Sequence, residues 1–107
     1  DWEEIWDDIS EVDFTGKKVA IYGLGDQIGY PEWFQDAMGY LHSKVVARGA
    51  IPCGYWPIDG YTYEASKALT PDGAHFVGLA LDEENEFSKT AERVAVWCKQ
   101  IRGEFGV

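Results

Sequence analysis

A glycine-rich loop that ends in an aromatic residue holds the residues of this chain best suited to binding chemistry. The loop reads Gly-Leu-Gly-Asp-Gln-Ile-Gly-Tyr over residues 23–30, directly after the apolar run 18–22 and directly before a helix-like run from Pro31. Glycines let a backbone approach a flat or phosphorylated ligand closely, because they carry no Cβ. A loop between a strand and a helix is the usual ligand position in an open α/β sheet.

Three interpretations of this loop compete. As a dinucleotide fingerprint, its GxGxxxG spacing is one residue too long, and Asp26 stands where a phosphate would have to approach. As a structural turn, it would use Tyr30 only for packing. As a site for a flat aromatic ligand, it would stack Tyr30 on the ligand and bond the ligand's edge with backbone N–H groups. The glycine spacing disfavours the first interpretation and leaves the other two open.

The elements around the loop alternate between helix and strand. We expect a helix over 1–10, strands over 19–22, 51–56 and 76–81, a helix over 31–48 and a final helix with Thr90 as N-cap. This order predicts one domain over 1–107, of the α/β class with a parallel sheet. The expected inner faces are Phe34, Ala37, Met38, Leu41 and Val45 on the middle helix, and Ala91, Val94, Ala95, Cys98, Ile101 and Phe105 on the last helix.

The overall charge limits the classes of partner. The chain of 107 residues has a formal net charge of -10, from 19 Asp and Glu against 9 Lys and Arg. This balance disfavours nucleic acid and an anionic membrane surface as partners. It favours solubility, or steering toward a positively charged protein. No apolar run approaches the roughly 20 residues that span a bilayer, and the acidic residues 1–8 do not resemble a signal peptide. We therefore expect a cytoplasmic protein.

Candidates for enzyme chemistry are scarce in this sequence. Cys53 and Cys98 are far apart, and no cysteine or histidine cluster has the spacing of a zinc site. His42 and His75 stand alone, and we interpret them as packing or surface residues. No nucleophile has a neighbouring base. The sequence therefore predicts a protein that is not an enzyme acting on its own.

Several motifs in chain order resemble the long-chain flavodoxins. They are Gly23 to Tyr30, Phe34-Gln35-Asp36-Ala37, Gly54-Tyr55-Trp56, Asp59-Gly60-Tyr61, Ser66-Lys67-Ala68, residues 76–82 and Glu104-Phe105-Gly106. The resemblance implies a flavodoxin-like parallel sheet with flanking helices. It also implies that residues 57–75 are the insertion that splits the last strand. It covers only the C-terminal portion of the family, so the first three strands and the phosphate loop are missing and the sheet is incomplete.

The resemblance also implies a cofactor, FMN, and assigns residues to its ring. Tyr30 matches the tyrosine that stacks on the isoalloxazine, and the backbone N–H groups of Asp26 and Gln35 match donors to its pyrimidine edge. Leu24 and Gly25 line the same edge. Trp33 departs from the polar residue of many relatives, although its carbonyl can still accept a hydrogen bond from the ring. The implied function is low-potential one-electron transfer by the flavin.

Acidic residues near the ring form an expected docking surface for a basic redox partner such as a flavodoxin reductase. They are Glu32, Asp82, Glu83, Glu84 and Glu86. An ordinary solvated loop is an equal alternative for the run 82–86. Strand 19–22 would present an open apolar edge, which invites pairing with a separate N-terminal portion or a second copy. We expect the chain alone to bind FMN weakly or not at all. The alternative function is a flavin-free assembly module that pairs through this edge.

Overall fold

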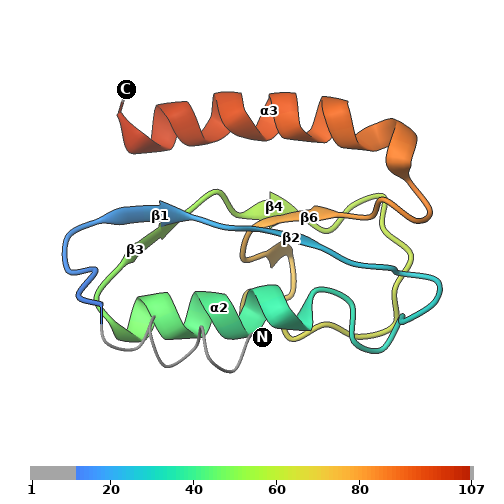
Figure 1. The fold of residues 1–107 in the computed structure, drawn as a ribbon, viewed down its shortest axis with the longest axis horizontal. Helices are drawn as coiled ribbons and strands as arrows, with labels where there is room; N and C mark the ends of the chain where they lie inside the picture. The colour runs from blue at the N-terminus through green and yellow to red at the C-terminus, as the bar shows by residue number, and fades with distance from the viewer. Residues whose placement is uncertain (1–11, 107) are drawn as a thin grey trace.

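Two helices enclose a small parallel sheet in the computed structural model, which describes residues 12–106. Helix α2, Asp36–Ala47, covers one face of the sheet, and helix α3, Phe87–Phe105, covers the other (Figure 1). The predicted α/β class with flanking helices is confirmed. The helix expected over 1–10 lies outside the described residues.

The sheet is built along one nearly continuous line of chain. Strand β1, Lys18–Ala20, pairs in parallel with β3, Ile51–Cys53, and strand β2, Tyr22–Leu24, pairs in parallel with β6, Leu79–Leu81. Strands β3 and β6 therefore lie one after the other along the same side of the segment 18–24. Among the described residues, no strand pairs with the other edge of this line.

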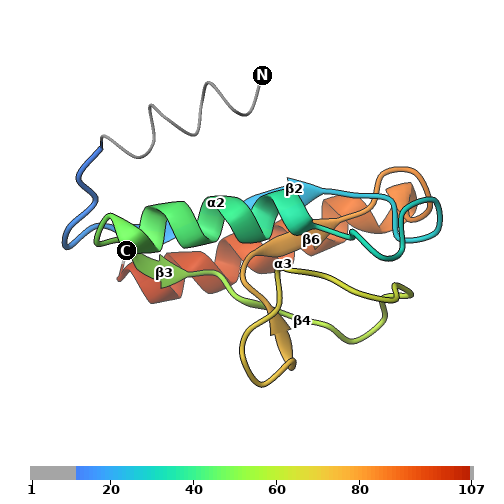
Figure 2. The ribbon, with the colours of Figure 1, turned by 90° about the horizontal axis from the view of Figure 1, so that it is seen from below.

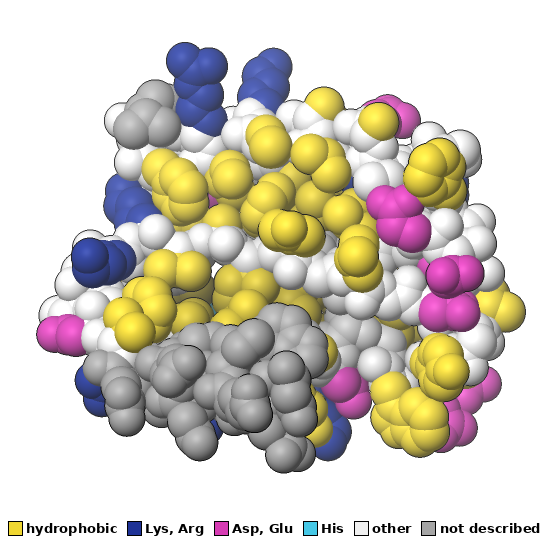
Figure 3. Space-filling view, in the orientation of Figure 1, with side chains coloured by type: hydrophobic (Ala, Val, Ile, Leu, Met, Phe, Trp, Pro, Cys, Tyr) yellow, Lys and Arg dark blue, Asp and Glu magenta, His cyan; other side chains and the backbone are white. Residues whose placement is uncertain are grey.

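The open edge exposes apolar side chains. Within residues 12–106, Tyr22 is 63% and Leu24 is 64% exposed. The expectation of an open apolar edge agrees with the structure. Hydrophobic side chains gather on the face of the molecule that carries this edge (Figure 3).

The chain leaves the sheet between β3 and β6. Strand β4, Trp56–Pro57, pairs antiparallel with β5, His75–Phe76, so both predicted strands in this region are interrupted (Figure 2). The first interruption falls at Gly54, which has a φ of 77°. An added Cβ at Gly54 would lie 2.9 Å from the indole nitrogen of Trp97, which donates a hydrogen bond of 2.7 Å to the Gly54 carbonyl. Glycine is therefore required at this bend.

Helix α2 begins at Asp36, later than the predicted start at Pro31. The residue before it, Gln35, has a φ of 64°, which is not helical. The carbonyl of Pro31 accepts hydrogen bonds from the N–H groups of Glu64 (2.8 Å) and Ala65 (2.9 Å), so the backbone there is committed to another segment. Glu32 consequently lies outside the helix, and Ala37 is exposed where burial was expected.

Helix α3 begins before the predicted cap Thr90, at Phe87, and it packs over β3 and β6. Its buried residue is Trp97, which packs with Leu79 and Leu81. The expected inner face is wrong at Ala91, Val94, Ala95 and Cys98, which are exposed. These side chains lie on the flank of α3 that β3 and β6 do not cover.

The main core lies between the sheet, α2 and residues 57–75, the segment that leaves the sheet. Phe34 packs against Tyr61, Tyr63 and Phe76, with ring centroids 5.6–5.9 Å from its own. Within residues 12–106, no helix is both long and apolar enough to cross a membrane. The same part of the chain holds no group of three His, Cys, Asp or Glu residues placed to bind a metal ion.

Candidate functional site

Two loops meet at the carboxyl ends of β2 and β6. The N–H of Gly25 donates a hydrogen bond of 2.9 Å to the carbonyl of Leu81, which extends the pairing of the two strands by one step. Beyond that point the loop after β2 and the loop after β6 leave the sheet side by side (Figure 1). This is the sheet edge at which parallel α/β proteins bind ligands.

Asp26 folds the first loop back on itself. Its Oδ1 accepts hydrogen bonds from the N–H groups of Ile28 (3.1 Å) and Gly29 (2.7 Å), and its carbonyl accepts one from the N–H of Tyr30 (2.9 Å). The bond from Gly29, together with one from the Asn85 side chain, lowers the pKa of Asp26 below its ordinary value. The carboxylate is therefore ionised and shapes the turn.

Several backbone donors at this site have no partner among the described residues. Among the described residues, the N–H groups of Asp26 and Gln35 have no hydrogen-bond partner, whereas Gly25 and the loop residues 27–30 all donate to protein acceptors. A backbone donor without a partner has to be satisfied by solvent or by a ligand. These are the two donors that the resemblance assigned to the flavin edge.

The first loop packs tightly against the residues before α2. An added Cβ at Gly25 would lie 2.9 Å from the ring of Phe34 and 3.0 Å from Nε2 of Gln35. That Nε2 donates a hydrogen bond of 3.0 Å to the Leu81 carbonyl, while Oε1 of the same side chain is buried without a partner among the described residues. Only glycine fits at position 25, which brings the backbone of the loop next to Gln35.

Tyr30 and Trp33 form an exposed aromatic pair. Their ring centroids are 6.3 Å apart with an interplanar angle of 31°, and the side chains are 60% and 63% exposed. A hollow of about 230 Å³ lies beside them, and all six predicted ring-binding residues line it: Leu24, Gly25, Asp26, Tyr30, Trp33 and Gln35. The structure thus brings these residues together around one space.

A second hollow also adjoins Tyr30. It has a volume of about 520 Å³, and it is lined by Leu24, Gly25, Asp26 and Tyr30 from the first loop and by Glu83 and Glu84 from the second. Acidic side chains gather at this end of the molecule (Figure 3). Tyr30 therefore lines both hollows, one of them partly aromatic and the other acidic.

The predicted docking residues divide into surface and internal groups. Glu32 is exposed, and Glu83 and Glu84 line the acidic hollow. Asp82 is fully buried, so its expected place on a docking surface is wrong. Burial alone would raise the pKa of Asp82, but hydrogen bonds from Asn85 and Gln27 outweigh burial and lower it.

Glu86 also differs from the expected free surface charge. It forms ion pairs of 2.9 Å with both Lys89 and Arg93. Burial opposes its ionisation, but the hydrogen bonds from Lys89, Arg93 and Gln27 outweigh burial and lower the pKa of Glu86. Its charge is therefore compensated within the protein.

Sequence analysis missed two amides that join the loops. Gln27 is 3% exposed; its N–H donates to Asp82 (3.1 Å), and its Nε2 donates to Glu86 (2.6 Å). Asn85 donates from Nδ2 to both Asp26 and Asp82. The available signal was their chemistry, since each is an amide with donors, and Asn85 lies within the acidic run 82–86 while Gln27 follows Asp26.

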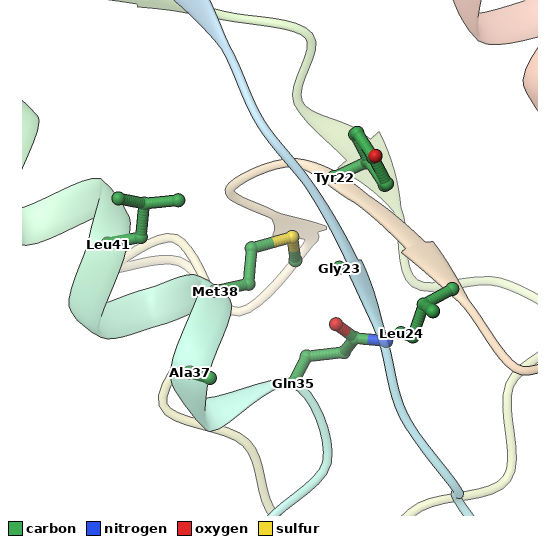
Figure 4. A pocket seen from close by; sticks show the side chains of 7 residues that line it. All are labelled: Tyr22, Gly23, Leu24, Gln35, Ala37, Met38 and Leu41. Atoms are coloured by element: carbon green, nitrogen blue, oxygen red, sulfur yellow. The ribbon is translucent and has the colours of Figure 1, made fainter. Parts of the chain in front are cut away.

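A separate groove follows the open edge of the sheet. It has a volume of about 510 Å³, lies between β2 and α2, and is lined by Tyr22, Gly23, Leu24, Gln35, Ala37, Met38 and Leu41 (Figure 4). Apart from Gln35, its side chains are mostly apolar. Oε1 of Gln35, which has no partner among the described residues, is the buried acceptor beside this groove.

Comparison with known proteins identifies close relatives of the chain. A family model described as flavodoxin matches residues 1–97. The chain is 49% identical over 104 residues to flavodoxin 2 of Salmonella typhi and 50% identical over 107 residues to a flavodoxin of Synechococcus elongatus. These matches cover 97% and 100% of this chain but only 60% and 62% of the two relatives.

A solved structure shows the same arrangement of elements. A flavodoxin of Fusobacterium nucleatum, solved with bound flavin mononucleotide, superimposes with a TM-score of 0.91 at 38% identity. The match covers 97% of this chain and 61% of that one. The chain therefore spans about three fifths of the length of the relatives it matches.

Proposed function

Since the chain belongs to the flavodoxin family, we propose that it supplies the ring-binding part of an FMN-dependent, low-potential one-electron carrier. One observation supports this most directly. The six residues assigned to the flavin ring line a single hollow, and the backbone donors assigned among them, those of Asp26 and Gln35, lack partners among the described residues.

Each of these residues has a separate part in the proposal. Tyr30 stacks on the flavin ring, and the N–H groups of Asp26 and Gln35 donate to its pyrimidine edge. The carbonyl of Trp33, which already accepts the N–H of Asp36 at 3.2 Å, has a second lone pair for a ring donor. FMN itself supplies the one-electron chemistry.

The charge of the protein favours a low potential in this proposal. A reduced flavin carries negative charge, and the formal net charge of -10, with Glu83 and Glu84 beside the Tyr30 loop, opposes the addition of that charge. Stacking on the electron-rich ring of Tyr30 acts in the same direction. The protein therefore sets the potential while the flavin carries the electron.

The described residues suit the flavin ring better than the phosphate of FMN. Residues 23–36 include Asp26, Glu32 and Asp36 but no Lys or Arg. A phosphate group needs donors and positive charge, such as a basic side chain or a free helix N-terminus. We therefore propose that these residues alone bind FMN weakly, and that a further segment, from a longer chain, a separate N-terminal portion or a second copy, completes the site.

The open edge of β1 and β2 is the proposed contact with that segment. It carries exposed Tyr22 and Leu24, the apolar groove and Oε1 of Gln35, which has no partner within residues 12–106. An extended segment can add to such an edge through backbone hydrogen bonds. The N-terminal portion of a longer flavodoxin, or a second copy, would cover it.

We further propose that residues 57–75 are the long-chain insertion.

The docking proposal rests on Glu32, Glu83 and Glu84, whose carboxylates remain available at the surface. They favour a basic redox partner in the cytoplasm, such as a flavodoxin reductase. The alternative function is a flavin-free assembly module, and the same open edge supports it. Flavin binding is expected for the electron carrier and is not expected for the assembly module.

The test compares FMN with riboflavin, which has the same ring but no phosphate. We expect the chain alone to quench the fluorescence of both flavins with similar, weak affinity. Tyr30→Ala should weaken binding by roughly threefold to tenfold, the range for a lost aromatic stacking contact. Tyr40→Ala, which removes a half-exposed ring from α2, is the matched control and should change little.

The size of the protein is measured in the same samples by light scattering. A preference for FMN that appears only in a dimer or a complex would support completion of the phosphate site by a second polypeptide. FMN binding of micromolar affinity by the monomeric chain would contradict that part of the proposal. If neither flavin binds in any state, the carrier function is wrong for this chain and the assembly module replaces it.

A further inference from the structure

The side-chain amide of Asn85 lies between two carboxylates. Its Nδ2 is 2.7 Å from Oδ1 of Asp26 and 2.9 Å from Oδ2 of Asp82. An amide nitrogen carries two hydrogens, so each carboxylate receives one of them. This single group ties the loop after β2 to the loop after β6.

The Asp82 side of this bridge is fixed. Asp82 directly follows β6 and is fully buried. Besides the Asn85 side chain, it accepts the N–H of Asn85 at 3.0 Å and the N–H of Gln27 at 3.1 Å. A buried carboxylate with several donors has little freedom to move, because each lost bond would leave it unpaired in a low-dielectric site.

The Asp26 side of the bridge belongs to the turn that presents Tyr30. The same Oδ1 that contacts Asn85 also accepts the N–H groups of Ile28 and Gly29, and the Asp26 carbonyl accepts the N–H of Tyr30. The position of the Asp26 carboxylate therefore sets the position of the aromatic ring. It also sets the direction of the free N–H of Asp26.

We propose that Asn85 is a positioning residue for flavin binding, which holds the Tyr30 turn against the buried Asp82 through Asp26. This proposal rests on the proposed function, because it assigns Asn85 a role at the same ring site. Asn85 does not itself line either hollow beside Tyr30. It acts through Asp26, and it connects that site to the loop that carries Glu83 and Glu84.

The charges around Asn85 indicate which substitution should disrupt the bridge most strongly. The acidic groups near it are Asp26, Asp82, the loop neighbours Glu83 and Glu84 and, through Gln27, Glu86. The nearby cations, Lys89 and Arg93, already pair with Glu86, and Arg93 also lies 4.3 Å from the ring centroid of Tyr61. Asn85→Asp therefore removes both side-chain hydrogen-bond donors and adds a further carboxylate that has no free cation among these groups.

The experiment measures amide hydrogen exchange at Ile28 and Gly29 in the flavin-free protein. At pH 7 we expect about tenfold weaker protection in Asn85→Asp, as a lost charge-assisted hydrogen bond and added repulsion predict. Near pH 4 the difference should shrink, since a protonated acid at position 85 can again donate one hydrogen bond. Ser88→Asp adds the same charge at an exposed position and is the matched control.

Asn85→Ala is the second variant, in case the added charge prevents folding. It removes the bridge without adding charge, so the loss of protection should be smaller and should not depend on pH. Unchanged protection of Ile28 and Gly29 in Asn85→Ala, with the protein folded by circular dichroism, would overturn the proposal.

Flavin affinity gives the second readout, with riboflavin and FMN as probes. We expect Asn85→Asp to weaken binding of both flavins at pH 7 and to regain affinity at pH 5, whereas Ser88→Asp follows the parent protein. Weakened protection with parental flavin affinity would overturn the positioning role. A parent protein that binds neither flavin would overturn the proposed function and this role together. In that case, the protection of Ile28 and Gly29 from hydrogen exchange would show only whether Asn85 holds the turn.

Discussion

The side-chain amide of Gln35 donates a hydrogen bond of 3.0 Å to the carbonyl oxygen of Leu81 and joins the start of α2 to the end of β6. The other atom of that amide, Oε1, is buried next to Gly23 and has no partner within residues 12–106. The Leu81 carbonyl also accepts the N–H of Gly25 at 2.9 Å. The contact is thus favourable at one end of the amide and unfavourable at the other.

Replacing Gln35 by methionine tests whether the open edge is covered in the functional protein. In the chain alone, we expect the free energy of unfolding to change by less than about 0.5 kcal/mol, since the lost bond is offset by removal of a buried acceptor without a partner. Where another polypeptide covers the edge and donates to Oε1, the cost should rise to about 1–3 kcal/mol. Urea unfolding of both states measures the difference, and equal costs in the two would contradict it.

The bond between Trp97 and Gly54 predicts a larger effect in the chain itself. Trp97→Phe keeps most of the apolar contact with Leu79 and Leu81 but leaves the buried Gly54 carbonyl without its donor. We expect a loss of about 1–3 kcal/mol in the free energy of unfolding. Trp33→Phe, at an exposed position, should stay within about 0.5 kcal/mol. A similar effect of both substitutions in urea unfolding would show that the Trp97 bond contributes little.

Local features of the site were predictable from the sequence. The glycines and Tyr30 lie in a loop between a strand and a helix, and short-range spacing is enough to indicate such a loop. The six ring-binding candidates meet around one hollow because they belong to this loop and the turn directly after it. Chain proximity alone places them within reach of one another.

Features that depend on distant segments were not predictable in this way. Helix α2 starts at Asp36 because the Pro31 carbonyl accepts hydrogen bonds from the N–H groups of Glu64 and Ala65. These two residues lie far from Pro31 in the sequence. Asp82 resembles a surface residue within an acidic run, yet the N–H of Gln27 and the neighbouring Asn85 make its burial possible. Cys98 fits the apolar period of α3, but the sheet beneath that flank is absent from the described residues.

The acidic surface predicts how association with a basic redox partner depends on salt. Glu83→Gln and Glu84→Gln should each lower the association rate and weaken its dependence on ionic strength, because long-range attraction is screened beyond about 8–10 Å at physiological salt. Glu86→Gln should have a smaller effect, since the Glu86 side chain is only 13% exposed and does not line the acidic hollow beside Tyr30. Stopped-flow measurements at several salt concentrations test this order. An effect of Glu86→Gln as large as that of Glu84→Gln would contradict the division of the acidic residues.

His42 predicts a loss of stability in mild acid. Its Nε2 lies 2.8 Å from the hydroxyl of Tyr55 on the sheet side of α2, and burial lowers the pKa of His42 below its ordinary value of 6.5. The unfolded chain therefore takes up a proton at this position at a higher pH than the folded protein does. Stability should fall as the pH drops below about 6.5 and should level off once the pH passes the lower folded pKa. His42→Gln keeps a hydrogen-bonding side chain but does not titrate, so its urea midpoint should change less than that of the parent protein between pH 8 and pH 5. An equal change in the two proteins over this range would assign the acid sensitivity to other groups.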